Sequence, residues 1–353
     1  MENQSKTLII ESCEKIIESD FSNTSIVHVR NSVIIKEMLG ADLLSHASQI
    51  ESLMGNNYDS IICVYASPYM KYKTYMRIIE NNMDAKLFWL VNDHDLEDNI
   101  LLRNVVKEQG RKYNVICNNP RSGYRHWILG KKMCGKKLDD WIDEWHTVNL
   151  NCLIYRPSKG KKTLLTTNRS GCIYFGTFRK WRAKDMIHFN GLNYTISTSK
   201  KNTSKYMKAG IKARYVDRLS WEVGAESLRN FKYSIYFEDK HTHDHYAFMA
   251  NRYYECVMCD VLMLFDSRCS NTIKESGYNI PKELIVDNGE QANHVMDTLD
   301  EAENCYKYLL DRQRENCKEI IKNKIKTSNY LKSILIERRK LWQQPEEVGS
   351  VSL

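Results

Sequence analysis

Short apolar runs alternate along the chain with stretches in which apolar residues recur every three or four positions. The apolar runs are rich in Ile, Val and aromatic residues and predict strands at 7–10, 25–29, 61–65, 87–91 and 114–117. Helical patterns lie between them at 68–82 and 97–108. Because the strands are continuously apolar rather than alternating, the pattern predicts a parallel sheet covered by helices on both faces.

The alternation begins again after a Pro/Ser/Gly/Lys stretch at 156–162, which predicts a linker. Strands are expected at 172–175, 193–197, 233–237, 261–265 and 283–286, and helices at 182–189, 221–230, 247–258 and 291–303. A long charged helical stretch follows at about 305–342.

The sequence therefore predicts an α/β protein of two doubly wound, Rossmann-like domains facing an interdomain cleft. We expect the first domain at 1–158 and the second at 163–325. The remaining segment, 326–353, is expected to form a C-terminal helix that packs back on the first domain.

The composition is that of a water-soluble globular protein, with 42% hydrophobic and 27% charged residues. No apolar run is long enough to span a membrane, and the polar N-terminus lacks the order of a signal peptide. The eleven cysteines lie mostly in apolar surroundings, which is typical of a reducing cytosol. Cys256 and Cys259 form a CxxC with no second pair at zinc-ligand spacing, so we expect both in the core.

A strand, a tight turn and a helix start follow one another at 172–182, and this order predicts an anion site. The turn contains Gly176 and Thr177, and Arg179 and Arg182 open the helix. Free N–H groups and the dipole at a helix N-terminus favour negative charge, and two guanidinium groups add bidentate donors for phosphate. The alternative is that the turn only caps the helix.

Arg252 and Glu255 are three positions apart on a predicted helix and therefore share a face. The arginine could meet a phosphate while the glutamate accepts hydrogen bonds from the hydroxyls of a sugar. Together with the turn at 176–179, this pair indicates a pocket for a nucleoside diphosphate. The alternative is an intrahelical salt bridge.

Asp93 follows the strand at 87–91, which places it at the carboxyl end of the first sheet, facing the cleft. A carboxylate there could deprotonate an alcohol that attacks a sugar. Asp93 could instead cap the next helix, although Asp95 and Glu97 are better placed for capping.

A second strand end, at 237, brings Asp239 and Lys240 toward the cleft, where they could touch a donor sugar. The His-Thr-His-Asp-His run at 241–245 has the composition of a metal site, but it lies in a polar loop before a helix. We therefore predict no metal ligands.

The net charge is +8, and basic residues gather at 121–137, 159–162 and 200–218 among Tyr and Trp residues. Such clusters suit a polyanion such as DNA. We assign DNA contacts to Lys71, Lys73, Arg121 and Arg125. The alternative is an ordinary solvated basic surface.

Three stretches make the chain resemble the DNA β-glucosyltransferases of T-even bacteriophages, over about 58–266. They are 58–62 with 90–93, 173–182, and 252–266. The resemblance implies a GT-B enzyme that transfers glucose from UDP-glucose to 5-hydroxymethylcytosine in double-stranded DNA, with the target base flipped out of the helix. It implies a monomer in the cytoplasm of an infected bacterium.

The resemblance also implies a role for individual residues. Thr177, Arg179 and Arg182 would hold the pyrophosphate, with Gly176 in the same turn. Arg252 would bind phosphate, Glu255 would bind the ribose, and Asp93 would be the catalytic base.

The chain departs from this family where the donor sugar would lie. Phe175 stands where a second Gly is expected, the two arginines of the turn are one residue closer together, and 151–155 has no acidic residue. Residues 92–95 also resemble the phage α-glucosyltransferases, which retain the anomeric configuration. UDP-glucose and UDP-arabinose thus both stay open as donors, as does the anomeric outcome. Mg²⁺ or Mn²⁺ could aid the departure of UDP, although no Asp-x-Asp motif requires it.

Two other functions stay open. One is a GT-B transferase acting on a glycan or small molecule, which would not need the basic face at 121–137. The other is a non-catalytic DNA-binding protein on the same fold. Salt-sensitive binding to duplex DNA would exclude the first. The presence of Asp93, Arg179, Arg252 and Glu255 argues against the second.

Overall fold

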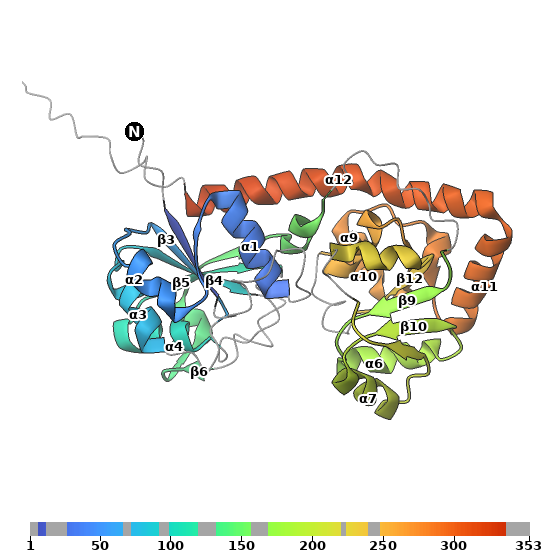
Figure 1. Cartoon of the computed structure of the whole chain (residues 1–353), viewed down its shortest axis with the longest axis horizontal. Coiled ribbons are helices and arrows are strands. Elements are labelled where there is room, and N and C mark those ends of the chain that lie inside the picture. The colour runs from blue at the N-terminus through green and yellow to red at the C-terminus, as the bar shows by residue number, and fades with distance from the viewer. Residues whose placement is uncertain are drawn as a thin grey trace, which may run out of the picture.

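The protein consists of two α/β domains bridged by one long helix (Figure 1). This computed structural model describes residues 6–11, 27–65, 72–91, 99–118, 132–156, 169–219, 224–238 and 248–336.

The first domain is built on a six-stranded parallel sheet with the order β2-β1-β3-β4-β5-β8. Its strands are β1 (Thr7–Glu11), β2 (Asp42–Leu44), β3 (Ser60–Tyr65), β4 (Lys86–Val91), β5 (Tyr113–Cys117) and β8 (Ile142–Thr147). Its helices are α1 (Val27–Leu39), α2 (Ile50–Leu53), α3 (Tyr72–Glu80) and α4 (Ile100–Gln109), and a short hairpin pairs β6 (Lys132–Met133) with β7 (Lys136–Lys137).

The second domain repeats this plan with the order β11-β10-β9-β12-β13-β14. Its strands are β9 (Cys172–Phe175), β10 (Tyr194–Ser197), β11 (Arg214–Val216), β12 (Tyr233–Tyr236), β13 (Leu262–Asp266) and β14 (Ile285–Val286). Its helices are α6 (Lys180–Met186), α7 (Lys200–Lys208), α9 (Asn251–Met258), α10 (Ser270–Ser276) and α11 (Gly289–Glu301). The 3₁₀ segments η6 (Leu150–Ile154) and η8 (Gly224–Asn230) pack against α9.

Both sheets are buried on both faces, as the continuous apolarity of their strands predicts. Along β1, Ile9 packs on the side of α1 and η6, whereas Leu8 and Ile10 pack toward α3 and α4. Successive side chains of a strand point to opposite faces, so a sheet between two helical layers needs apolar residues at every position. The predicted architecture of two doubly wound α/β domains is confirmed.

Two element predictions are wrong. The strand expected at 25–29 does not form, because residues from Val27 onward belong to α1. A run of five residues with three β-branched ones fits either element. The helical spacing of Ile35, Met38 and Leu39 further along, which pack against one core, distinguishes them. The helix expected at 221–230 is the 3₁₀ segment η8 within the described residues.

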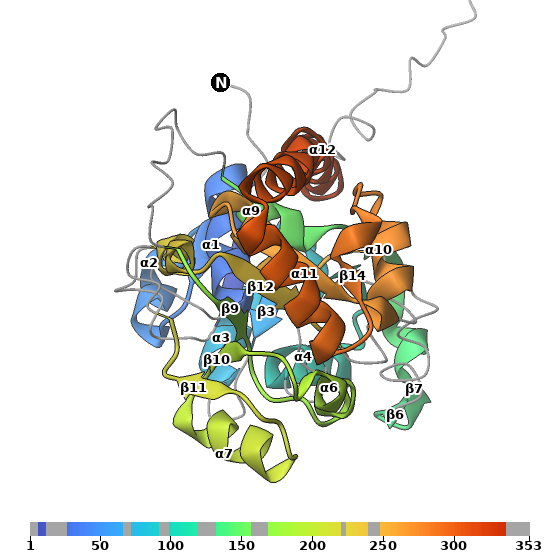
Figure 2. The same ribbon diagram turned by 90° about the vertical axis from the view of Figure 1, so that its right-hand side faces the viewer.

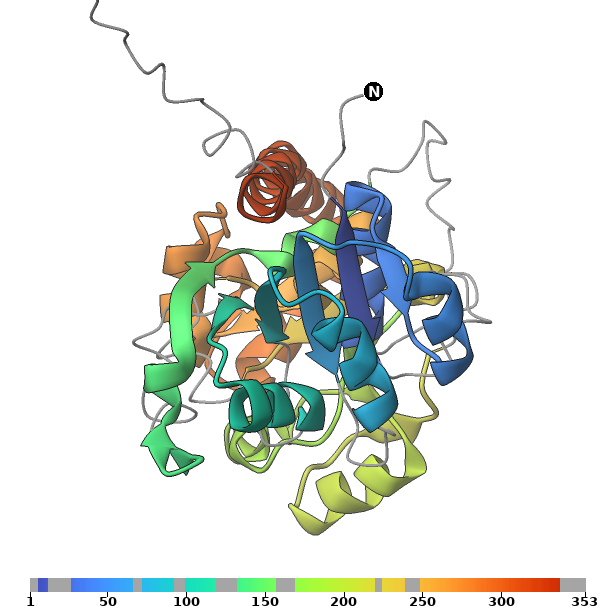
Figure 3. The same ribbon diagram turned by 90° about the vertical axis from the view of Figure 1, so that its left-hand side faces the viewer.

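The long helix α12 (Glu303–Leu335) runs along both domains. Views turned by 90° to either side show it lying across one end of the molecule (Figures 2 and 3). Gln313 bonds to the backbone of Met263 in the second domain at 2.9 Å. Near the other end of the helix, the Ser60 hydroxyl donates to the carbonyl oxygen of Leu335 at 3.0 Å, and His146 Nδ1 lies 3.0 Å from the Tyr330 hydroxyl. None of the described helices combines the length and apolarity needed to cross a membrane.

Gly289→Ala should destabilise the protein, because a Cβ at this position would lie 2.5 Å from the backbone nitrogen of Leu192. The other atoms it would meet, the carbonyl oxygen of Phe189 and the carbonyl carbon of Gly191, are also backbone, so α11 and the turn at 189–192 must separate. We expect a loss of about 1–3 kcal/mol in the free energy of unfolding, as for other overpacked sites. Gly55→Ala is the control, since a Cβ there meets no atom within 4 Å. Equal denaturant midpoints for the two variants would contradict the argument.

Candidate active site

The candidate site lies where the strand order of the second sheet reverses. β9 has β10 on one side and β12 on the other, so the chain leaves these strands in opposite directions. In open α/β sheets, such a switch point at the carboxyl ends of the strands is where ligands bind. The turn at 176–179 follows β9, and Glu238 follows β12 by two residues. The topology therefore brings both segments to one place.

The turn at 176–179 is held by bonds to its carbonyl groups. Thr198 Oγ1 donates to the carbonyl oxygen of Gly176 at 2.8 Å, and the Tyr206 hydroxyl donates to that of Thr177 at 3.1 Å. A Cβ on residue 176 would lie 3.0 Å from the Tyr174 hydroxyl and 3.6 Å from Arg252 Nη2, so glycine lets the backbone approach these groups. Thr177 and Arg179 are exposed.

Two buried arginines share one buried carboxylate beneath this turn. Glu238 Oε2 accepts from Arg182 Nη2 at 2.9 Å, and Glu238 Oε1 accepts from Arg252 Nη1 at 2.7 Å. Glu238 is only 3% exposed. Among the residues that the structure describes, these three side chains carry two guanidinium charges and one carboxylate charge. Their sum is positive, and positive charge in a region of low dielectric constant attracts an anion.

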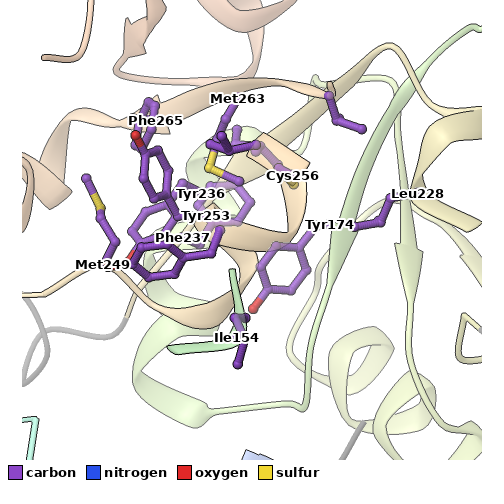
Figure 4. Packing of buried hydrophobic residues seen from close by; sticks show 14 of the residues in the cluster. Ile154, Tyr174, Leu228, Tyr236, Phe237, Met249, Tyr253, Cys256, Met263 and Phe265 are labelled. Carbon is purple, nitrogen blue, oxygen red and sulfur yellow. The ribbon is translucent and has the colours of Figure 1, made fainter. Parts of the chain in front are cut away.

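Aromatic residues complete the surroundings of the arginines. The Tyr174 hydroxyl accepts from Arg182 Nη1 at 2.9 Å, and the Arg252 guanidinium lies 5.2 Å from the Tyr174 ring and 5.6 Å from the Tyr236 ring. Both rings belong to the aromatic core of the second domain (Figure 4). Burial alone would lower the pKa of Arg252, but the Glu238 carboxylate together with the Tyr174 and Tyr236 hydroxyls raises that pKa above its ordinary value.

Arg252 and Glu255 share α9 but bond to partners on other elements. Arg252 bonds to Glu238 and to the carbonyl oxygen of Phe237. Glu255, 2% exposed, accepts from Arg30 Nη1 of α1 at 2.6 Å. The two residues of the predicted pair therefore lie in different surroundings. Arg252 belongs to the switch point of the second sheet, and Glu255 contacts the first domain.

Hydrogen bonds of polar side chains, to each other and to the backbone, join the region around α9 to the first domain. The Tyr254 hydroxyl accepts from Asn149 Nδ2 at 3.0 Å, and Asn151 Nδ2 donates to the carbonyl oxygen of Met249 at 2.8 Å. Asn251 is 9% exposed, and its side-chain amide bonds to no residue in the described part of the chain. A buried amide beside charged groups is typical of a site that a ligand completes.

The structure brings together Gly176, Arg182 and Arg252, with Thr177 and Arg179 on the same turn. Lys73 lies exposed on α3. The other predicted site residues lie outside the described residues: Asp93, Asp239, Lys71, Arg121 and Arg125. Asp93 follows the last residue of β4, a central strand of the first sheet, by two positions.

Sequence reasoning missed Glu238, Tyr174 and Arg30. Glu238 precedes the predicted Asp239, and one signal for it was its place directly after an apolar strand. Arg30 had a weaker signal, the one arginine in a segment where valines and polar residues mix, Val-His-Val-Arg-Asn-Ser-Val. No sequence signal pointed to Tyr174, because an aromatic residue inside a buried strand is typical of the hydrophobic core.

The CxxC cysteines lie in the core. Cys256 and Cys259 are at most 2% exposed, and burial raises the pKa of both thiols, that of Cys259 to about 12. Within the described ranges, no three His, Cys, Asp or Glu side chains are grouped so that they could hold a metal ion.

Comparison with known proteins identifies the fold. At the level of sequence, neither a protein-family profile nor a curated protein matches the chain. Solved structures do match, and they define the class: this is the GT-B fold of UDP-glucose-dependent glycosyltransferases.

One of the solved structures that this chain is similar to is the β-glucosyltransferase of T4 phage. A mutant of that enzyme bound to UDP-glucose matches with a TM-score of 0.66 at 16% identity, over 94% of this chain and 99% of that one. The same enzyme bound to UDP and Mn²⁺ also gives 0.66, at 15% identity, with the same coverage of both chains. An α-glucosyltransferase in complex with UDP and a 13-mer DNA containing an HMU base gives 0.55 at 11% identity, over 94% of this chain and 100% of that one.

Glu238→Gln should destabilise the protein strongly, because it leaves two buried guanidinium charges without their carboxylate. Breaking a buried ion pair from one side costs about 3–5 kcal/mol. Glu51→Gln is the matched control, since it breaks the Glu51–Arg77 pair, whose side chains are 75% and 49% exposed, and should cost at most about 1 kcal/mol. Urea unfolding measures both. If Glu238→Gln is as stable as Glu51→Gln, the carboxylate does not hold the site together.

Proposed function

We propose that this protein is a glycosyltransferase that moves a sugar from a UDP-sugar to the hydroxymethyl group of 5-hydroxymethylcytosine in double-stranded DNA. The observation that supports this most is the Arg182–Glu238–Arg252 network at the switch point of the second sheet. The GT-B fold around it matches an enzyme bound to UDP-glucose over 94% of this chain. In this proposal residues 1–158 bind the acceptor and residues 163–325 the donor, while 326–353 packs on the first domain.

The second domain would bind the UDP part of the donor. Arg182 and Arg252 are already fixed by Glu238, so they present positive charge without further ordering. Preorganised charge of this kind stabilises the departing diphosphate in the transition state. Arg179 and Thr177, exposed on the turn that Gly176 permits, would contact the pyrophosphate directly.

The ribose and the transferred sugar would lie toward the first domain. Glu255 would accept hydrogen bonds from the ribose hydroxyls while Arg30 holds one of its oxygens. Asp239, which follows Glu238, would touch the sugar. UDP-glucose is the donor of the T4 enzyme, and the departures in this chain keep UDP-arabinose as a second candidate.

The acceptor would be a base extruded from the duplex. Asp93 would remove the proton of its hydroxymethyl group as that oxygen attacks the anomeric carbon. Lys71, Lys73, Arg121 and Arg125 would hold the DNA backbone. DNA as the partner is supported by the basic clusters and by the α-glucosyltransferase complex that contains an HMU base. The T4 enzyme has been seen with Mn²⁺. Mg²⁺ or Mn²⁺ stays a candidate here, and we assign it no ligand.

The direct test mixes the protein with hydroxymethylated duplex DNA and a panel of UDP-sugars, followed by mass spectrometry of the nucleosides. The added mass identifies the sugar. Transfer to a glycan or a free small molecule with none to DNA would favour the alternative acceptor. Binding of DNA without transfer from any donor would favour a non-catalytic protein.

Arg179→Ala should weaken donor use without affecting folding, because Arg179 is exposed at the start of α6. We expect kcat/KM for the UDP-sugar to fall by the equivalent of about 2–4 kcal/mol, the scale of one charge-stabilising donor. Lys180→Ala removes an adjacent exposed cation and is the control. Calorimetry with UDP and steady-state kinetics measure the effect. Full activity in Arg179→Ala would remove this residue from the diphosphate site.

Asp93→Asn keeps the size of the side chain but cannot accept the proton. Turnover should fall about a hundredfold or more, while the affinities for UDP and DNA stay near wild type. A variant that remains active would move the role to Asp95 or His94. Loss of UDP binding would instead make Asp93 a structural residue.

A further inference from the structure

A stripe of lysines runs along the outer face of α7. Lys201, Lys205 and Lys208 are separated by four and three positions, so they lie on one side of the helix. All three are exposed, and none forms an ion pair with another described residue. Seven Lys or Arg residues fall within 200–218, against one acidic residue, Asp217. This end of the second domain therefore carries a dense positive charge.

The inner face of α7 contacts the donor turn. Tyr206 is fully buried, and its hydroxyl donates to the carbonyl oxygen of Thr177 at 3.1 Å. Its ring lies edge-on to that of Phe178, with centroids 5.2 Å apart. The helix is thus fixed to the same turn that we assign to the diphosphate.

The position of α7 suits a long polyanion. Figure 1 shows α7 on the side of the second domain opposite α12, and the β6–β7 hairpin on the same side of the first domain. Figure 2 shows that α7 and the hairpin are separated along the viewing direction of Figure 1. The hairpin also carries exposed lysines, Lys132, Lys136 and Lys137. The stripe from Lys201 to Lys208 is about 10 Å long at 1.5 Å per residue, which matches about three phosphates of one DNA strand.

We propose that the outer face of α7 is a second DNA-binding surface, which binds the phosphate backbone of the duplex while the first domain receives the target base. This inference rests on the proposed function. Lysine side chains offer point charges without base-specific geometry, so the surface would position the duplex and not read its sequence.

The triple variant Lys201→Ala, Lys205→Ala, Lys208→Ala tests this surface. Its affinity for an unmodified duplex, measured by fluorescence anisotropy at several salt concentrations, should depend less steeply on salt. The slope of log K against log salt should fall by about 2–3, since each phosphate contact contributes about 0.9. KM for hydroxymethylated duplex should rise about tenfold or more, while kcat at saturating DNA and the affinity for UDP stay unchanged.

The matched control is Lys274→Ala, Lys282→Ala, Lys326→Ala, which removes three exposed lysines from other elements. It should leave the salt slope and KM near wild type. If the two triple variants behave alike, the α7 surface is not a DNA site, although the proposed function survives. If the α7 variant loses affinity only for an anionic polysaccharide such as heparin, the inference is also wrong. A wild-type protein that binds no duplex would overturn the proposed function itself.

Discussion

The candidate ligand site of the second domain depends on one buried carboxylate. Glu238 pairs with Arg182 of α6 and Arg252 of α9 at 2.9 and 2.7 Å, so three separate elements meet at a single charge. Without it, two guanidinium groups would face each other in a region of low dielectric constant. With it, they keep fixed positions and a net positive charge. The site can therefore receive an anion without reorganising, which is the condition for effective electrostatic stabilisation.

Helix α9 links this site to the relation between the domains. Its first turn carries Arg252, which belongs to the switch point, and the next carries Glu255, which bonds to Arg30 of the first domain. Tyr254 between them bonds to Asn149. A ligand that engages Glu255 must join or displace Arg30. If the proposed function holds, donor binding and the position of the first domain would be coupled through this helix of eight residues.

The fold itself tolerates wide change in sequence. The chain shares 16% of its residues with the T4 phage enzyme, yet the two match over 94% of this chain with a TM-score of 0.66. Parallel sheets buried on both faces require only apolar strands of the right length and order. The fold does not by itself fix an activity, which depends on a few side chains at the strand ends. This chain departs there from the family that it resembles.

The apolar pattern by itself determined the two parallel sheets, since strands without alternation must be covered on both sides. The sequence also located the turn at 176–179. A glycine, a hydroxyl and two arginines after a buried strand indicate an anion site from neighbouring residues alone. The apolar pattern did not distinguish α1 from a strand at 25–29, because a five-residue run with three β-branched residues suits either element. Only the tertiary structure decided the partners of the charges. Arg252 and Glu238 are fourteen residues apart, and Glu255 and Arg30 are 225 apart. Such pairs arise from strand order and domain packing, which a local pattern of residues does not contain.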